Sequence, residues 1–266
     1  PEEQFGYPAY FFDVQLKNAD NTITYEAGVD FIFHEATQTL ELLSLNASPA
    51  APLSVNVTAK VADLDAVTAA HIIGGSAAGV RTGAQLLREC YQRFGYFAKV
   101  IIAPGFTDDA GVVTELTAVA EATRAMVLAD VPLGADVQTA IEGRGPAGSI
   151  NLQSASLRVV YCYPYVVNSA GKTEPLSAYA AGALTRKDQE NGYWWSPSNT
   201  PINGIVGLTE PLAAMINDPL SDVNLLNEAG ITTVLNSYGT SLRLWGNRSA
   251  AWPSDTDPRN FICGQR

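Results

Sequence analysis

The sequence predicts a layered domain of mixed α/β (α+β) class over residues 66–266, with a mixed sheet flanked by helices. A smaller β-rich module of barrel or sandwich type precedes it over residues 1–65. Three observations support this fold. Strand-like segments dominate residues 5–63, and from about residue 66 helical periodicity alternates with short apolar strands. Apolar residues make up 47% of the 266, which is enough for a sizeable core.

The first module is predicted from four extended segments. Apolar and β-branched residues gather at residues 10–12, 29–33, 40–45 and 53–61, with breaks rich in Asn, Asp, Ser, Ala and Pro between them. The break at 48–52 fits either an interdomain linker or a surface loop. We place the domain boundary near Asp65, where the pattern changes, and interpret residues 1–65 as an incomplete or inserted outer module.

The second domain is predicted from alternating helices and strands. Gly95, Gly192 and Gly230 follow three of the helices as C-terminal stops, Thr107 or Asp108 can cap the second helix, and Pro175 suits a first helical position. The expected helices cover residues 80–94, 107–123, 136–142, 175–191, 209–216 and 221–229; the expected strands cover 99–103, 124–130, 157–167, 231–236 and 241–248.

The last helix and the two strands after it form the most informative stretch. Ser221 is a candidate N-cap, and the β-branched run 231–236 is followed by a turn at 237–240. Residues 241–248 alternate in character, so the sequence predicts a β-hairpin docked behind the end of a helix. We expect Leu244 and Trp245 to pack this hairpin against the core.

Composition argues against several functional classes. A net charge of −11 and a pI near 4.6 disfavour binding to nucleic acid or to anionic membranes. No apolar run reaches the roughly 18 residues that a membrane span needs. Cys90, Cys162 and Cys263 are widely spaced, which predicts free thiols rather than a disulfide framework or a zinc site.

Two glycine motifs raise the alternative of a nucleotide-binding α/β enzyme. Gly143, Gly145 and Gly148 match G-x-G-x-x-G, but a helix precedes them, a proline interrupts them and no helix follows, which favours a surface loop. The segment 171–173, Gly-Lys-Thr, resembles the end of a phosphate loop. Because Val166 stands where that motif needs its first glycine, we interpret the segment as a turn.

The remaining candidates for chemistry have structural interpretations. His34 and His71 lack a partner at metal-ligand spacing, and no serine lies in G-x-S-x-G. Asp108 and Asp109 suit helix capping better than acid–base catalysis. We therefore predict no catalytic, cofactor or metal-binding residues. The aromatic runs 193–195 and 161–165 are interpreted as core, with an exposed contact or a sugar-stacking platform as the alternative for both.

Two strings in the informative stretch carry a family resemblance. Residues 225–233, LLNEAGITT, and 242–249, LRLWGNRS, resemble the most recognisable segment of contractile tail sheath proteins of bacteriophages and related injection devices. Further similar segments lie, in the expected order, at residues 72–75, 99–106, 196–199, 202–205 and 257–262. The residues that carry the resemblance are Asn227, Glu228, Gly230, Trp245, Gly246, Asn247, Arg248, Ser196, Pro197, Asn203 and Gly204.

The resemblance implies a structural subunit rather than an enzyme. Subunits of this family stack as hexameric rings around a tail tube and contract to drive the tube through a host envelope. The implied partners are other sheath subunits, the tail tube protein and the baseplate, with no cofactor, nucleic acid or membrane insertion. The implied location is the tail sheath of a virion made in the bacterial host cytoplasm.

The resemblance covers about residues 72–262. Residues 1–65 do not share it, which fits the variable outer insertions that sheath subunits often carry. The resemblance also implies that the chain is a core or protease-resistant part, truncated before a C-terminal assembly domain. A host-surface carbohydrate-binding role for residues 1–65 is the second alternative function.

Overall fold

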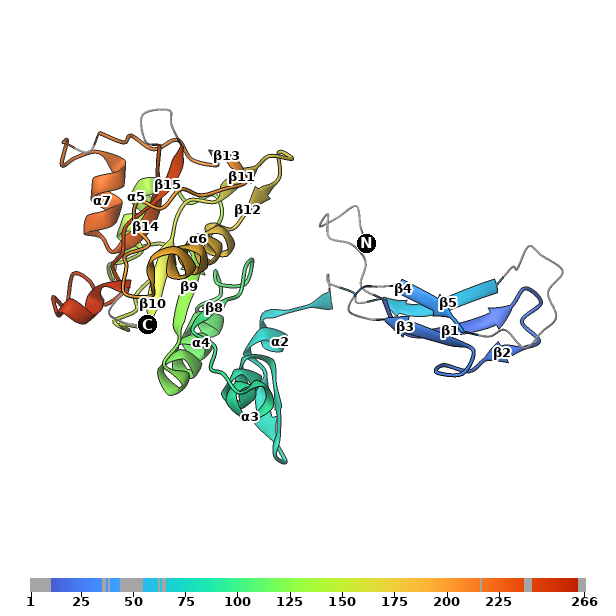
Figure 1. Cartoon of the computed structure of the whole chain (residues 1–266). Helices are drawn as coiled ribbons and strands as arrows, with labels where there is room; N and C mark the ends of the chain where they lie inside the picture. Colours follow the sequence, from blue (N-terminus) through green and yellow to red (C-terminus); the bar gives the residue numbers. More distant parts are fainter. Residues whose placement is uncertain are drawn as a thin grey trace. The chain divides into compact units, whose positions relative to one another are not determined.

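The computed structural model describes residues 11–34, 37, 39–43, 55–61, 63, 66–215, 217–236 and 241–262. The chain divides into two compact units, residues 1–67 and 68–266 (Figure 1). Three predicted features lie outside the described residues: the break at 48–52, the turn at 237–240 and Cys263.

Unit 1 is built from two antiparallel sheets. The strands are β1 (Phe11–Asn18), β2 (Thr24–Tyr25), β3 (Phe31–His34), β4 (Thr39–Leu42) and β5 (Val55–Val61). One sheet has the order β2-β1-β5, and the other is the β3–β4 pair. Leu16, Tyr25 and Phe31 form its buried core. Unit 1 is therefore β-rich as expected. Its described strands form two separate sheets, which do not confirm the expected barrel form.

The centre of unit 2 is a five-stranded mixed sheet of order β15-β14-β10-β9-β8. Its strands are β8 (Val100–Ile102), β9 (Met126–Asp130), β10 (Val159–Cys162), β14 (Ile231–Asn236) and β15 (Leu242–Trp245). Four of them run parallel, and β15 pairs antiparallel with β14. The five strands of the main sheet lie within the five predicted strands, the hairpin is confirmed, and the layered α/β class is correct. The expected strand 157–167 is too long, because residues 163–165 interrupt it and β10 ends at Cys162.

Helices cover both faces of this sheet. The helices α4 (Ala110–Thr123), α6 (Leu176–Asn191) and α7 (Asp222–Glu228) pack on its strands. Behind them, α2 (Ala69–Ile73) packs on α4, and α5 (Val137–Glu142) packs on α7. Alternate residues of β9 face opposite cores, with Val127 in the core that α4 shares and Met126 in the core that α6 shares. Figure 1 shows α6 and α4 beside the strands they cover.

The expected helix 80–94 is wrong over most of its length. Strands β6 (Gly75–Ala77) and β7 (Val80–Thr82) form a hairpin, a 3₁₀ helix η2 (Gly83–Glu89) follows, and only α3 (Cys90–Phe94) is α-helical. Gly83 explains the interruption, because it has φ +56° and a Cβ there would lie 2.6 Å from His71 O. The predicted stop at Gly95 is confirmed, with φ +78°.

The expected helix 209–216 is also wrong over the described residues 209–215. Partners outside the segment satisfy its backbone instead. Thr209 N donates to Tyr165 O at 3.0 Å, and Ala213 N donates to Asp222 Oδ2 at 2.7 Å. These long-range bonds replace those that a helix would supply.

Two helix starts differ slightly from prediction. Asp109, rather than Thr107 or Asp108, caps α4, since its Oδ1 accepts from Gly111 N at 2.7 Å. Thr107 is buried and its Oγ1 accepts from Asp130 N at 2.8 Å, which ties the loop after β8 to the end of β9. Pro175 occupies the N-cap position of α6 rather than its first helical position.

A smaller antiparallel sheet of order β12-β11-β13 flanks the main sheet. It contains β11 (Val166–Asn168), β12 (Thr173–Glu174) and β13 (Ile205–Leu208). The predicted turn at 171–173 is confirmed, because Asn168 Oδ1 accepts from the amides of Ala170 and Lys172 at 2.9 and 3.0 Å. A short 3₁₀ helix, η3 (Pro258–Asn260), follows the main sheet. Within the described part of the chain, no helix is long and apolar enough to cross a bilayer.

Candidate functional site

Most of the motif residues meet at one end of the sheet, in a network that we name the motif hub (residue 144 with residues 196–202, 227–232 and 242–252). Residues 199–202 pair with the outer edge of β15. Three backbone bonds hold them: Asn199 N to Leu244 O at 2.6 Å, Leu244 N to Thr200 O at 2.9 Å, and Ile202 N to Leu242 O at 2.9 Å. The edge strand therefore has its backbone polar groups satisfied from within the chain.

The Ser-Pro-Ser segment before this pairing is joined to the end of β15 through side chains. Gly246 N donates to Ser198 Oγ at 3.2 Å, and Asn247 Nδ2 donates to Ser196 Oγ at 3.2 Å. Pro197 O accepts from Thr200 N at 3.2 Å, which closes the turn between them. The structure thus brings together two motif segments that are about fifty residues apart.

Two motif glycines lie where the backbone is crowded. Gly246 has φ +112°, and a Cβ there would lie 3.1 Å from Thr232 Cα. Gly230 has φ +74°, and a Cβ there would lie 3.1 Å from Trp252 O. Both positions favour glycine, because side chains rarely adopt these φ values and the neighbouring atoms are backbone. The predicted stop at Gly230 is confirmed.

Arg248 connects the end of α7 to the segment after β15. Its Nη1 donates to Asn227 O at 2.9 Å and to Glu228 Oε1 at 3.2 Å. Its guanidinium lies 4.1 Å from the ring centroid of Trp252, whose Nε1 donates to Glu228 O at 3.0 Å. The motif pair Asn227 and Glu228 thus binds the motif cation Arg248.

Arg144 is a central residue of this region that the sequence analysis did not identify. Its guanidinium donates to four backbone carbonyls, those of Ala229, Leu152, Ala250 and Trp252. It also lies 5.2 Å from the ring centroid of Tyr161. Burial lowers the pKa of Arg144 from its usual value. A charged residue between two glycines was the available signal, but three of its four acceptors, the carbonyls of Ala229, Ala250 and Trp252, lie far away in the sequence.

The hairpin residues Leu244 and Trp245 differ in their surroundings. Leu244 is 2% exposed and belongs to the core beneath α6, as expected. Trp245 is only half-buried and lies outside the described core clusters, so the expectation that it packs against the core is wrong for this residue. The reason is strand geometry, since neighbouring residues of β15 point to opposite faces.

Asn203 and Gly204 lie apart from the hub contacts, at the turn that leads into β13. Gly204 has φ +83°, and its carbonyl accepts from Ser169 N at 3.2 Å. Asn203 lines a shallow cavity beside α6, together with Arg186 and Pro201. These two motif residues therefore position the small sheet rather than the hairpin.

The glycine motif 143–148 is a tight loop that folds back on itself. A Cβ on Gly148 would lie 2.5 Å from Glu142 O, and one on Gly143 would lie 2.7 Å from Ile150 Cγ1. Residues 143–158 contain no helix, so the strand–loop–helix arrangement of a dinucleotide site is absent from this part of the chain, which the structure describes fully. The loop interpretation is confirmed.

The two aromatic runs, residues 161–165 and 193–195, differ in how far their rings are buried. Tyr161 and Tyr163 are buried in the core, as predicted. Tyr193, Trp194 and Trp195 are each more than half exposed, so the core interpretation is wrong for them. They follow the C-terminus of α6, where Gly192 at φ +95° turns the chain away from the helix and leaves their rings on the surface.

Asp130, at the carboxyl end of β9, is a buried acid that the sequence analysis also did not identify. It is 1% exposed, and it accepts from Ser177 N at 2.7 Å and from Ser177 Oγ at 2.5 Å. It therefore joins the sheet to the first turn of α6. Burial raises the pKa of Asp130 to about 6, against the opposing effect of the Ser177 hydrogen bonds. An acid that ends an otherwise apolar strand was its only sequence signal.

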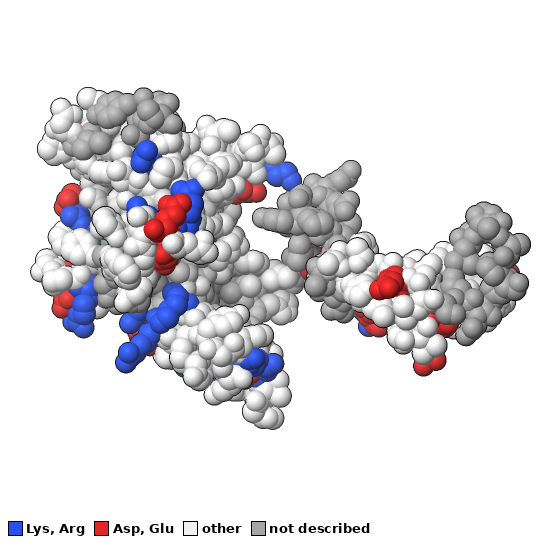
Figure 2. All heavy atoms as spheres, viewed as in Figure 1, with Lys and Arg blue, Asp and Glu red and all other residues white. Residues whose placement is uncertain are grey.

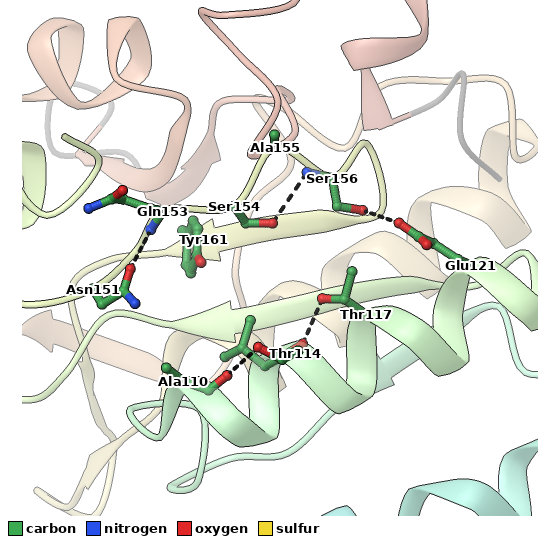
Figure 3. A pocket seen from close by; sticks show the side chains of 11 residues that line it. Ala110, Thr114, Thr117, Glu121, Asn151, Gln153, Ser154, Ala155, Ser156 and Tyr161 are labelled. Carbon is green, nitrogen blue, oxygen red and sulfur yellow. Dashed lines mark hydrogen bonds between the residues drawn. The ribbon is translucent and has the colours of Figure 1, made fainter. Parts of the chain in front are cut away.

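A polar cavity of about 380 Å³ lies between α4 and residues 151–156 (Figure 3). Figure 3 shows Thr114 and Thr117 on the helix side and Ser156 bonded to Glu121 at 3.2 Å across one end. Both threonine hydroxyls donate to carbonyls of their own helix, at 2.7 and 2.6 Å. These polar groups serve the local structure, and their arrangement does not resemble a nucleophile with its base.

The histidines have structural partners. His34 Nε2 lies 2.9 Å from Glu41 Oε2 on the surface of unit 1, and His71 Nδ1 accepts from Thr68 N at 3.1 Å at the start of α2. Among the residues that the structure describes, no group of three His, Cys, Asp or Glu side chains is placed to hold a metal ion.

Comparison with known proteins identifies the family. Residues 79–250 match the phage tail sheath protein central domain. The chain is 45% identical over 252 residues to the tail sheath protein of Burkholderia phage BcepMu, covering 92% of this chain and 53% of that protein. It is 37% identical over 196 residues to a prophage major tail sheath protein assigned in Pseudomonas aeruginosa (strain UCBPP-PA14), covering 73% and 50%. The chain belongs to the phage tail sheath protein family.

The fold agrees with a solved structure of a contractile particle. A chain in the cryo-EM structure of the anti-feeding prophage baseplate in the contracted state superposes with a TM-score of 0.51, at 19% identity, over 70% of this chain and 49% of that chain. The chain spans about half the length of the curated relatives that it matches.

Proposed function

We propose that this chain forms the central part of a contractile tail sheath subunit. In this role it assembles with other copies as stacked hexameric rings around a tail tube, and the stack contracts to drive the tube through a host envelope. The observation that carries the proposal is the family match over residues 79–250, together with 45% identity to a phage tail sheath protein.

The motif hub supports a structural rather than an enzymatic role. Its arginines donate to backbone carbonyls and to one carboxylate, and its serines, asparagines and glycines join β15 to neighbouring segments. These groups hold the domain in one conformation. A subunit needs this when it moves as a rigid body between the two states of the lattice. We propose that the work of contraction is stored in contacts between subunits rather than in a reaction at this hub.

The proposed partners are further sheath subunits, the tail tube protein and the baseplate, and the proposed location is the tail sheath of a virion assembled in the bacterial cytoplasm. The fold likeness to a baseplate-particle chain is compatible with this location. Neither the nucleotide-binding alternative nor the carbohydrate-binding alternative for residues 1–65 gains support from the comparisons.

Electron microscopy of the full-length subunit, expressed with and without its tube protein, tests the proposal. We expect hollow tubes or stacked rings with sixfold symmetry. A subunit that stays dispersed at high concentration, with and without tube protein, would contradict the proposed function.

A further inference from the structure

Residues 91–97 form a continuous exposed surface that is rich in aromatic rings. The four aromatic residues are 55%, 62%, 64% and 47% exposed; in order they are Tyr91, Phe94, Tyr96 and Phe97. Tyr91 stacks on Phe97 with centroids 4.7 Å apart, and Phe94 stacks on Tyr96 at 5.9 Å. We name these four residues the aromatic patch.

The core of unit 2 does not use these rings. The neighbouring segment packs on the core through Ala84, Leu87, Ile72 and Ile73, whereas the four aromatic residues are outside that cluster. A fully buried aromatic side chain removes roughly 150–250 Å² from water. Four rings that are about half exposed therefore leave an apolar surface of a few hundred Å², which on a soluble protein indicates a contact site.

The charge around the aromatic patch differs in sign from that of the whole chain. Residues 68–99 contain four basic residues (Arg81, Arg88, Arg93 and Lys99) and one acidic residue, Glu89, for a net charge of +3. The whole chain carries −11, so the remaining residues carry −14. In Figure 2, the part of the surface formed by α3 and the β6–β7 hairpin is mostly white, with blue atoms and little red.

Local pairing does not remove this positive charge. Glu89 is bound by Arg81 at 3.1 Å and by Arg93 at 2.6 Å, so the single carboxylate of the segment is shared between two guanidinium groups. These two pairs hold the pKa of Glu89 below its usual value. The segment therefore presents aromatic area with an excess of cations, which an acidic protein surface complements.

We propose that the aromatic patch docks on the acidic surface of a second copy of this chain, outside that copy's residues 68–99. This inference rests on the proposed function, in which copies of one subunit contact each other. Two patches of equal positive charge would repel each other, so the contact joins different surfaces of the two copies. Such head-to-tail contacts generate rings or open helical stacks.

The contact has two physical components. Burial of the rings supplies most of the affinity, and the opposite charges accelerate association and fix its orientation. The charge component is screened at high ionic strength, where the Debye length falls to about 3 Å at 1 M salt. Association through the aromatic patch therefore weakens with salt but is not abolished by it.

A photo-crosslinking amino acid in place of Phe94 identifies the surface that the patch meets. Unlabelled chain that carries the crosslinker is mixed with ¹⁵N-labelled chain, and crosslinked peptides are read by mass spectrometry. We expect mixed-isotope crosslinks from position 94 to carboxylate-bearing peptides outside residues 68–99. Crosslinks within one copy only, crosslinks between two 68–99 segments, or no crosslinks up to millimolar protein would overturn the proposal.

The double variant Phe94→Glu, Tyr96→Glu tests the affinity, with Leu220→Glu as a matched control because Leu220 is 76% exposed and lies outside the patch. In sedimentation equilibrium of the chain, we expect the double variant to self-associate at least about tenfold more weakly. Its thermal unfolding should match that of the parent chain, and the control should associate as the parent does. Equal association of the double variant and the parent, or equal weakening by the control, would contradict the inference.

The same variants in the full-length subunit separate this inference from the proposed function. Loss of tubes in the double variant alone supports both. Normal tubes from the double variant overturn the docking surface but leave the sheath function in place. Failure of the parent subunit to form tubes contradicts the proposed function itself.

Discussion

The motif hub and the aromatic patch lie in the same unit but use their side chains in opposite ways. In the hub, charged and polar side chains point inward and satisfy backbone groups of distant segments. In the patch, aromatic rings remain exposed beside an excess of positive charge. Most residues that carry the sequence resemblance therefore make contacts within the subunit, whereas the surface that we propose as a contact site lies outside those motif strings.

Removal of the guanidinium at position 144 should break the hub most severely. Arg144→Met leaves four backbone carbonyls without their donor, in a site where each hydrogen bond to a charged group contributes about 1.5–3 kcal/mol. Because partial rehydration offsets some of this loss, we expect the free energy of unfolding to fall by about 3–5 kcal/mol in urea titrations. Arg88→Met is the control, since Arg88 Nε donates to a single partner, Gln85 Oε1, at 2.8 Å. Similar losses in both variants would contradict the central role of Arg144.

Substitutions in the hairpin test which face of β15 supports the hub. Leu244→Ala should cost about 3 kcal/mol, because it leaves a cavity in the core beneath α6. Trp245→Ala should cost less despite its larger side chain, because Trp245 is half-buried on the opposite face. Thermal or chemical unfolding of the two variants measures the difference. A larger loss of unfolding free energy for Trp245→Ala would mean that Trp245, rather than Leu244, packs in the core, and would reverse our assignment of the faces.

The buried acid Asp130 predicts a pH dependence of stability. Its pKa is raised from 3.8 to about 6, so the folded protein holds this proton more tightly than the unfolded chain does. Its contribution to stability is therefore complete below about pH 4 and is lost as the pH rises through about 6. At about 1.36 kcal/mol per pH unit, the loss reaches at most about 3 kcal/mol.

Asp130→Asn should remove this dependence, because the amide oxygen can still accept from Ser177 and carries no charge. The measurement is the unfolding free energy of both proteins between pH 4 and pH 6.5. Asp257, whose pKa is lowered to about 2 by Arg259, has the opposite sign and loses its contribution only at lower pH. Parallel pH profiles for the parent and the variant would show that Asp130 does not titrate as stated.

Two glycine-to-alanine substitutions, one in the hub and one inside α6, are expected to change the free energy of unfolding by smaller amounts and in opposite directions. Gly246→Ala combines a φ of +112° with a close approach to Thr232 Cα, and should destabilise the chain by about 1–3 kcal/mol. Gly182→Ala lies inside α6, where an added Cβ meets nothing within 4 Å, and should stabilise the chain by up to about 1 kcal/mol. The shift in melting temperature measures both effects. An unchanged or raised melting temperature for Gly246→Ala would mean that the hub backbone relaxes around the new side chain.

Periodicity and end signals predicted much of the fold. The helices ending at Gly192 and Gly230 and the hairpin after Gly230 follow from residues close in sequence, and the structure confirms them. The helix expected at 80–94 failed because Gly83 packs against His71 O, a contact that helical spacing does not reveal. Local patterns thus predicted elements well where neighbours in sequence decide the conformation.

The hub was predicted only in part. The sequence resemblance named Gly246 and Arg248, but not the long-range partners that give them a physical role. Arg144 and Asp130 were missed because their partners lie in distant segments. The exposed residues 193–195 were assigned to the core because hydrophobicity alone does not show on which side of a turn a ring lies.

Hydrogen exchange of the free and assembled subunit tests the contrast between the two regions most directly. We expect amides of residues 231–236 and 242–252 to exchange slowly in both states. Amides of residues 91–97 should exchange quickly in the free subunit and become at least about tenfold slower on assembly, because a second copy covers the aromatic patch. Fast exchange in the hub, or unchanged exchange at residues 91–97 in assembled tubes, would contradict the division between an inward-bonded hub and an outward-facing contact surface.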